Sequence, residues 1–224
     1  MSASATAERG RAPARTRLTP RVIGIALTVI VVAAIALDTT YRDADAPRAT
    51  ASGRPAFDRD TYGRETFPKI AQAIEQQATP LPKLLGALRT DQAAASEQYG
   101  HREGNAPYSF PVSGEGVAGA PENGVLPLTV KGVPKSTSVS VQIGPALPGT
   151  AVRDATGEIS FGQFVNQVEF ADAATALNNE IKSKVLAPLD PAALEGERVR
   201  FVGAFTYLAP AVVTITPVKL EPAS

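Results

Sequence analysis

The chain has 224 residues, and its 22 lysines and arginines balance its 22 aspartates and glutamates. This length allows one domain with additional tails, and the balanced charge gives no electrostatic reason to expect nucleic-acid binding, which favours a basic face. There is no cysteine, which excludes disulfides, thiolate metal sites, thiol nucleophiles and lipid attachment through a cysteine. There is also no tryptophan, so the core must be built from aliphatic side chains and phenylalanine.

The N-terminal region contains a hydrophobic segment. Residues 1–21 are rich in Ala, Arg and Ser and predict a disordered cytoplasmic tail. Residues 22–37 read VIGIALTVIVVAAIAL without a charge, and as a helix they would span about 24 Å, against a hydrocarbon core of about 30 Å. Five basic residues precede the segment and favour a cytoplasmic N-terminus: Arg9, Arg11, Arg15, Arg17 and Arg21.

We therefore expect residues 22–37 to be a single-pass transmembrane anchor that places the rest of the chain outside the cytoplasm. A cleaved signal peptide fits the same charge pattern, with Ala34-Ile35-Ala36 as a small-residue cleavage site. A buried core helix is the third interpretation. Residues 38–56 lack periodicity and contain Asp, Pro, Gly and Ser, so they predict a linker.

The folded region, predicted to be residues 57–221, begins with a helical hairpin. Phe67, Ile70 and Ile74 lie on one helical face, and Pro68 suits the first turn of that helix. Thr79-Pro80-Leu81-Pro82 interrupts the pattern. A second apolar stripe then predicts a helix that ends near Tyr99-Gly100; it consists of Leu81, Leu84, Leu85 and Leu88.

From residue 108 onward the apolar period changes to two, which is typical of half-buried strands. Five strands are predicted, around Tyr108–Val112, Leu126–Val130, Val139–Ile143, Val199–Phe205 and Val212–Leu220. A helix from Ser160 to Leu186 separates the third strand from the fourth.

This order predicts an α+β fold: an N-terminal membrane helix, a helical hairpin, and an OB-like five-stranded β-barrel with a helix between strands 3 and 4. The long connection from Gly144 to Glu158 is where irregular functional backbone is expected.

Two segments carry a resemblance to a known family. They are IGPALPGTAVRDA (143–155) and FGQFVNQVEFA (161–171), with support from Gly114-Glu115-Gly116 and Ile215-Thr216-Pro217-Val218. The chain resembles a bacterial family of predicted periplasmic lipoproteins whose domain has no known function, over about residues 57–221. The resemblance implies a membrane-tethered protein outside the cytoplasm. Members are often encoded beside sugar ABC transporters, which implies an accessory role there.

The chain departs from that family at its anchor. Many members end the hydrophobic segment with a cysteine that is acylated, but the corresponding residues here are Ala34-Ile35-Ala36-Leu37-Asp38. If the resemblance holds, the hydrophobic helix replaces the lipid as the means of attachment.

Residues suited to catalysis or metal binding are scarce. His101 is the single histidine, and one histidine without cysteine cannot form a usual zinc site. The loop GPALPGT (144–150) lacks the ending of a phosphate loop, and its prolines remove amide donors. We expect a structural turn there, with a ligand contact at Thr150 as the alternative. No catalytic residue, metal or cofactor is predicted.

Four further residues are candidates for binding. Arg153 and Asp154 should point to opposite faces of an extended chain, so that each finds a separate partner. They either brace the long connection or recognise a ligand or a partner. Asn166 and Gln167 lie within an apolar helical stripe and need hydrogen-bond partners if buried. They either brace the same connection, bind a sugar hydroxyl, or are exposed.

Two functions follow as hypotheses. The first is a membrane-anchored accessory module, not an enzyme, that binds an ABC transporter or its solute-binding protein. The second is direct binding of a small polar ligand such as a sugar by Thr150, Arg153, Asp154, Asn166 and Gln167.

Overall fold

The computed structural model describes residues 56–223. The tail, the hydrophobic segment 22–37 and nearly all of the linker lie outside these residues. Within residues 56–223, no helix combines the length and the apolar character that a membrane crossing requires. The predicted transmembrane anchor therefore stays a prediction from the sequence.

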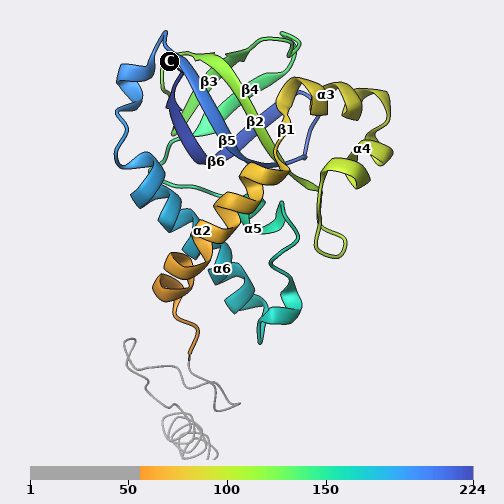
Figure 1. The fold of residues 1–224 in the computed structure, drawn as a ribbon, viewed down its shortest axis with the longest axis vertical. Coiled ribbons are helices and arrows are strands. Elements are labelled where there is room, and N and C mark those ends of the chain that lie inside the picture. The colour runs from red at the N-terminus through yellow and green to blue at the C-terminus, as the bar shows by residue number, and fades with distance from the viewer. Residues whose placement is uncertain (1–55, 224) are drawn as a thin grey trace, which may run out of the picture. The chain divides into compact units, whose positions relative to one another are not determined.

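The five predicted strands form a closed barrel. They are β2 (Ser109–Ala118), β3 (Val125–Val130), β4 (Ser138–Gln142), β5 (Arg198–Thr206) and β6 (Val212–Pro222). The sheet runs β2-β3-β4-β6-β5, and β5 pairs back onto β2 to close it. All pairs are antiparallel except β4 with β6. The OB-like strand order is confirmed, and the barrel occupies the upper half of Figure 1.

The apolar residues that alternate along each strand point inward and fill the barrel interior. Phe110 and Phe205 face one another from the neighbouring strands β2 and β5, with ring centroids 5.5 Å apart. Val141 of β4 and Ile215 of β6 are also fully buried in this cluster. These apolar side chains provide the main hydrophobic contribution to the stability of the barrel.

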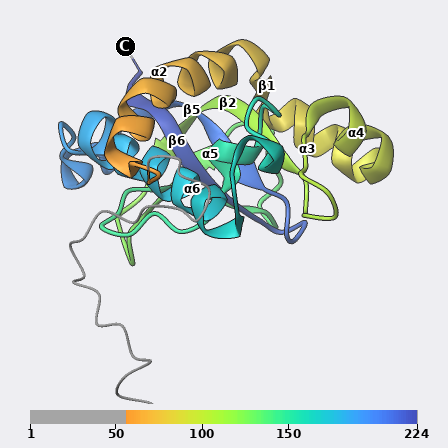
Figure 2. The ribbon, with the colours of Figure 1, turned by 90° about the horizontal axis from the view of Figure 1, so that it is seen from below.

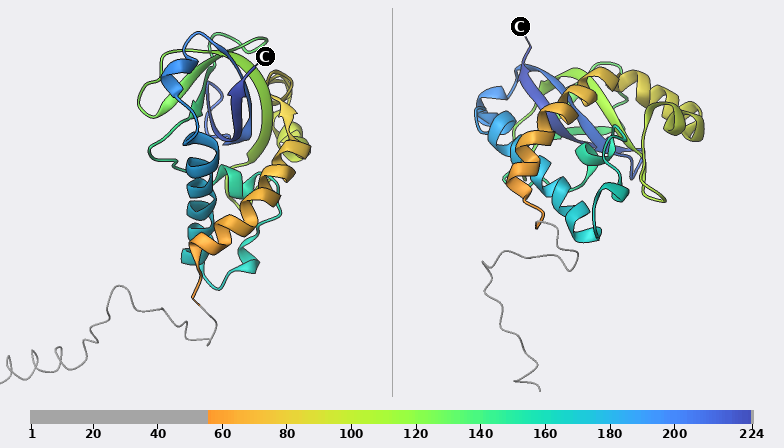
Figure 3. Two further views of the ribbon diagram at one scale, coloured as in Figure 1. Left: turned by 60° about the vertical axis from the view of Figure 1, so that its left-hand side comes forward. Right: turned by 60° about the horizontal axis from the view of Figure 1, so that its bottom comes forward.

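Two long helices pack side by side against the outside of the barrel, α2 (Arg59–Gln77) and α6 (Gln167–Ile181) (Figures 1 and 3). Their buried faces form a second apolar cluster with the outer face of the sheet, which includes Ile70, Ile74, Leu177, Ile181 and Ala204. The helices approach closely because α2 has a glycine at the contact. A Cβ at Gly63 would lie 3.0 Å from the carbonyl oxygen of Ala176.

The N-terminal helices differ from the prediction in three places. Helix α2 begins at Arg59, capped by Asp58, so Pro68 lies inside the helix on an exposed face and not in its first turn. A short strand β1 (Thr79–Pro80) pairs parallel with β2. The second predicted helix is broken at Asp91, which ends α3 (Leu81–Thr90) and caps α4 (Gln92–Tyr99).

The predicted helix from Ser160 to Leu186 is shorter and differently built. A 3-10 turn covers Phe161–Gln163, α6 starts only at Gln167, and a π-helical turn, Lys182–Leu186, follows it. Phe164 is extended between the two elements. A further 3-10 turn, Pro191–Leu194, precedes β5. Figure 2, seen from below, shows the single-turn helix α5 (Ala151–Asp154) beside α6.

A glycine substitution tests the packing of the barrel wall. A Cβ at Gly203, where the register of β5 against β6 shifts, would lie 2.8 Å from Ile215 Cγ2 and 2.9 Å from Pro217 Cα. We expect Gly203→Ala to lower the free energy of unfolding by about 1–3 kcal/mol through overpacking. Chemical denaturation measures it.

The matched control is Gly86→Ala within α3, where a Cβ meets no atom within 4 Å. Alanine there should raise stability by about 0.5–1 kcal/mol, because glycine loses more conformational entropy in a helix. Equal effects of the two substitutions would contradict this account of the barrel wall.

Candidate functional site

Thr150, Arg153 and Asp154 form one buried network on the connection between β4 and α6. Helix α5 is a single turn that follows Thr150. The carboxylate of Asp154 accepts hydrogen bonds from Thr150 Oγ1 at 2.6 Å, from Arg153 Nε at 2.7 Å and from Arg153 Nη2 at 3.1 Å. Both charged residues are buried, with 7% and 6% of their surface exposed. A bidentate arginine–carboxylate pair of this kind is strong and geometrically specific.

Arg153 also reaches α6. Its Nη1 donates to the carbonyl oxygen of Phe170 at 2.9 Å, and the guanidinium carbon lies 3.5 Å from the centre of the Phe170 ring. The planar guanidinium of Arg153 therefore contacts a carboxylate, a backbone carbonyl and the face of an aromatic ring. Arg153 thus fastens the β4–α6 connection to the first turn of the helix that follows.

The expectation that Arg153 and Asp154 would take separate partners is wrong. It assumed an extended chain, whereas both residues belong to a helical turn, where successive side chains are not on opposite faces. The long arginine side chain folds back onto the neighbouring carboxylate. The structure therefore supports the bracing interpretation of this pair: its donors and acceptors face each other and the backbone.

Asn166 and Gln167 lie at the start of α6 and do not join this network. Asn166 caps the helix: its Oδ1 accepts from Glu169 N at 2.9 Å, while Glu169 Oε2 accepts from Val165 N at 3.2 Å. Gln167 and Asn166 are exposed. The apolar stripe assigned to this stretch is therefore wrong at its beginning, and Val168 is 65% exposed. The spacing Asn-x-x-Glu is a helix-start pattern that could have placed this boundary.

Two buried amides were not singled out from the sequence. Asn178 of α6 donates to the carbonyl oxygens of Leu147 and Gly149, each at 3.0 Å. Gln142 at the end of β4 donates to Pro148 O at 3.3 Å and accepts from Thr216 Oγ1 at 3.0 Å. Together they hold the backbone carbonyl groups of residues 147–149 in the loop 144–150. A polar residue on the buried face of α6 was the available signal for Asn178.

This fixed loop forms one wall of a groove of about 720 Å³ on the outside of the barrel. Val213 and Ile215 point into the barrel, so the alternate residues of β6 point outward to form the floor. The groove is lined by prolines, threonines and aliphatic residues and by no charged residue: Pro107, Gln142, Pro148, Gly149, Thr150, Ala151, Thr206, Leu208, Ala209, Val212, Thr214 and Thr216.

Most polar groups of the groove already have a partner. Thr206 Oγ1 is hydrogen-bonded to Ser109 Oγ at 2.9 Å. Thr150 donates to Asp154, Thr216 donates to Gln142, and Gln142 donates to Pro148. On the rim, Leu208 is 77% exposed and Val212 is 52% exposed. The groove therefore offers an apolar, uncharged surface rather than free hydrogen-bonding groups.

His101 lies away from this groove. Its ring packs against Gly157, where a Cβ would come within 2.8 Å of the imidazole. It borders a separate polar cavity of about 430 Å³ together with Gln77, Thr79, Gln98 and Thr156. Among residues 56–223, no cluster of three metal-ligating side chains accompanies it.

The fold, together with the family match and the structural match given next, defines this protein as an extracytoplasmic, membrane-associated OB-barrel protein. The model of the family described as "Predicted periplasmic lipoprotein (DUF2291)" matches residues 26–221. The chain belongs to this family of predicted periplasmic lipoproteins, whose function is unknown. Because the chain has no cysteine, it lacks the residue to which a lipoprotein's lipid is attached.

The fold also occurs in a solved structure. It is described as an OB-fold protein from Thermotoga maritima, with 20% sequence identity and a TM-score of 0.62. The match covers 75% of this chain and 99% of that one. At this identity the likeness shows the fold alone. None of the curated proteins matches the chain.

The buried arginine provides the first test of this site. We expect Arg153→Ala to lower the free energy of unfolding by about 3–5 kcal/mol, because it leaves the Asp154 carboxylate buried without its partner. Arg59→Ala is the control, since its pair with Asp172 is 3.4 Å long and Arg59 is 55% exposed. That exposed pair should contribute less than about 1 kcal/mol. Similar losses in both variants, measured by denaturation, would refute the bracing role.

Tyr62 next to this network gives a pH-dependent test. Burial raises the pKa of Tyr62 above its usual value of 10.0, although a hydrogen bond with Thr66 and the charge of Arg153 oppose the shift. The unfolded chain therefore ionises first, and the stability contributed by neutral Tyr62 is lost as pH rises from about 10 through the folded-state pKa. The difference in unfolding free energy between wild type and Tyr62→Phe should fall over this range. A constant difference would contradict the burial of the phenol.

Proposed function

We propose that this protein is a non-catalytic accessory module that binds an apolar segment of a protein partner in the groove beside β6. The supporting observation is the uncharged groove of about 720 Å³ with Leu208 and Val212 exposed on its rim. Apolar surface of this kind, held by a rigid scaffold, is typical of an interaction site. The family's predicted periplasmic location supports an interaction outside the cytoplasm.

The proposed partner is a component of a carbohydrate ABC uptake system, either the transporter or its solute-binding protein. This choice comes from the family resemblance, whereas the groove determines the chemistry of the contact. A partner segment would offer aliphatic side chains to the groove, because a charged group would be desolvated there without a counter-charge.

Direct sugar binding is the alternative. The groove carries four threonine hydroxyls, at positions 150, 206, 214 and 216. Three of them, and Gln142, are already hydrogen-bonded within the protein, and no aromatic ring lines the groove for a sugar to stack on. These features favour a protein partner over a free sugar.

Site-specific photo-crosslinking in cells tests the proposal. A photoreactive amino acid at Leu208 should crosslink to an uptake-system component. The same amino acid at Val117, which is 45% exposed on β2 and is not among the groove residues, should not. Leu208→Asp should reduce recovery of that component at least tenfold without changing stability. Equal crosslinking from both positions, or none from Leu208, would exclude the groove as the partner site.

A thermal-shift experiment addresses the alternative. Under the proposal, pentoses and hexoses leave the melting temperature of the full chain unchanged. A sugar that raises the melting temperature in wild type but not in Thr214→Val would instead establish direct sugar binding in the groove.

A further inference from the structure

A second exposed apolar surface lies at the start of α6. Five large apolar side chains are markedly exposed among residues 56–223, and two of them border the groove described above. Two others, Val165 at 45% and Val168 at 65%, flank the Asn166 cap three positions apart. The fifth, Val117, stands alone on β2. The exposed pair at α6 is therefore a distinct surface.

This pair lies between Phe164 and Phe170 in the sequence, and these two residues belong to a cluster of aromatic rings that we name the aromatic end. Phe164 contacts Phe57 and Tyr62 with ring centroids 5.8 Å apart in each case, and Phe170 at 5.4 Å. Phe161 packs on Phe170 at 5.7 Å. Phe57, Tyr62, Phe161 and Phe164 are only partly buried. Arg153 donates to the carbonyl oxygen of Phe170, which fixes the position of one member of this cluster.

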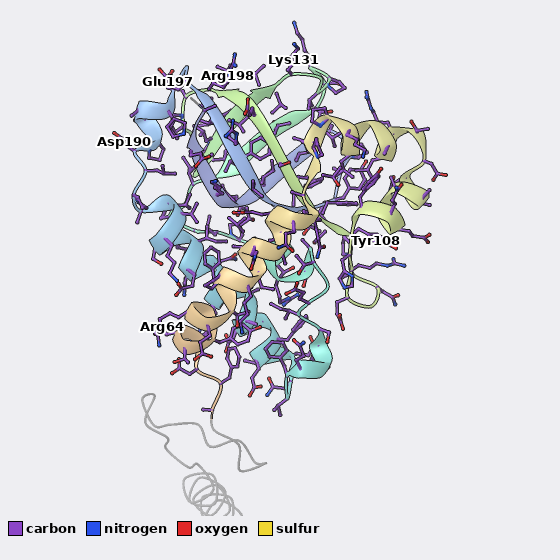
Figure 4. The ribbon with its side chains drawn as sticks, in the orientation of Figure 1. Arg64, Tyr108, Lys131, Asp190, Glu197 and Arg198 are labelled. Atoms are coloured by element: carbon purple, nitrogen blue, oxygen red, sulfur yellow. The ribbon has the colours of Figure 1, made fainter. Side chains whose placement is uncertain are left out.

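The chain enters the domain at this same end. Phe57, a member of the cluster, directly precedes the Asp58 cap of α2. Figures 1 and 3 show the first turns of α2 and α6 together at the end of the domain away from the barrel. In Figure 4, Arg64 of α2 marks this end, whereas Glu197 and Arg198 mark the far end.

The predicted linker between the hydrophobic segment and the domain is short. Residues 38–56 separate the hydrophobic segment 22–37 from Phe57. A flexible chain of this many residues has a root-mean-square length of about 25 Å, whereas a domain of this size has a radius of gyration of about 15 Å. With residues 22–37 in a membrane, a linker of this length would favour an orientation in which the aromatic end faces the bilayer.

We propose that the aromatic end is the membrane-facing surface of the domain and that Val165 and Val168 insert into the headgroup region of the bilayer. Partly exposed aromatic rings beside aliphatic side chains suit this boundary, where one side is apolar and the other wet. The inference depends on membrane attachment through residues 22–37, and it is independent of the groove and its partner.

The charges around the aromatic end favour insertion over attraction to acidic lipids. Arg59 pairs with Asp172, and Arg64 donates to Thr61. Asp60 and Glu65 stand exposed on the same part of α2. This surface is therefore not basic, and contact with a neutral phosphatidylcholine bilayer should persist at high salt.

Tryptophan scanning tests the orientation, because the chain contains no native tryptophan. The full chain is reconstituted into phosphatidylcholine vesicles with nitroxide quenchers on the upper acyl chain. Val165→Trp and Val168→Trp should lose at least half of their fluorescence. The matched control is Val117→Trp, because Val117 is as exposed as Val165, at 45%, and pairs with Arg198 at the far end; it should lose little.

The outcomes separate this orientation from other arrangements. Vesicle flotation first establishes that each variant is membrane-bound. Strong quenching at positions 165 and 168 alone, unchanged in 0.5 M salt (about a 4 Å screening length), supports the proposal. Equal quenching at all three positions, or none in floated protein, overturns it. A dimer would also overturn the proposal. It would be detected by light scattering in the absence of lipid, together with protection of the Val168→Trp fluorescence from a soluble quencher, because a second copy of the chain would then cover the surface.

Discussion

The arrangement of the β4–α6 connection and α6 outside the barrel depends on the contacts of the Arg153 guanidinium. A buried arginine must have its donors occupied, because an unpaired buried charge is strongly destabilising. Here the carboxylate of Asp154, the carbonyl of Phe170 and the ring of Phe170 meet that need together. One side chain thereby sets the distance between the β4–α6 connection and the helix that follows it. Both exposed apolar surfaces are built on elements that this contact positions.

The groove and the aromatic end show how an OB barrel acquires features that its strands alone do not supply. The barrel wall contributes the outward residues of β6, and the loop 144–150 contributes the opposite wall. Asn178 and Gln142 hold that loop in place through its backbone carbonyls. The aromatic end in turn is formed where the first turns of α2 and α6 meet. Buried polar side chains thus hold the backbone in place through hydrogen bonds, whereas apolar side chains are exposed at the surface.

The strands were predictable from the sequence because the barrel has one apolar side, which imposes a period of two. All five appeared close to their predicted positions, and the helix after the third strand is present but shorter than predicted. The first helix and the stretch around 160–168 were predicted less well. Pro68 was placed in a first turn, although an exposed position inside α2 tolerates it. Phe161 and Phe164 fall within the predicted helix from Ser160, but Phe161 lies in a 3-10 turn and Phe164 is extended.

The candidate site was predictable in its location but not in its contacts. The connection 144–158 was expected to hold irregular backbone, and Thr150 on this connection borders the groove. The pairing of Arg153 with Asp154 depends on a single helical turn that four residues of sequence cannot specify. Asn178 acquires its role from two carbonyl groups about thirty positions away. Such contacts are properties of the tertiary structure.

The parallel pairing of β4 with β6 determines when the groove can exist. Residues 143–211, with α5, α6 and β5, intervene between these two strands. The floor of the groove on β6 and the wall formed by the loop 144–150 therefore come together only after all of this intervening chain is available. For a domain that folds outside the cytoplasm, the groove forms only once the residues up to Thr216 have crossed the membrane. A chain that has crossed only as far as β5 would carry α2 and α6 but would lack the floor of the groove.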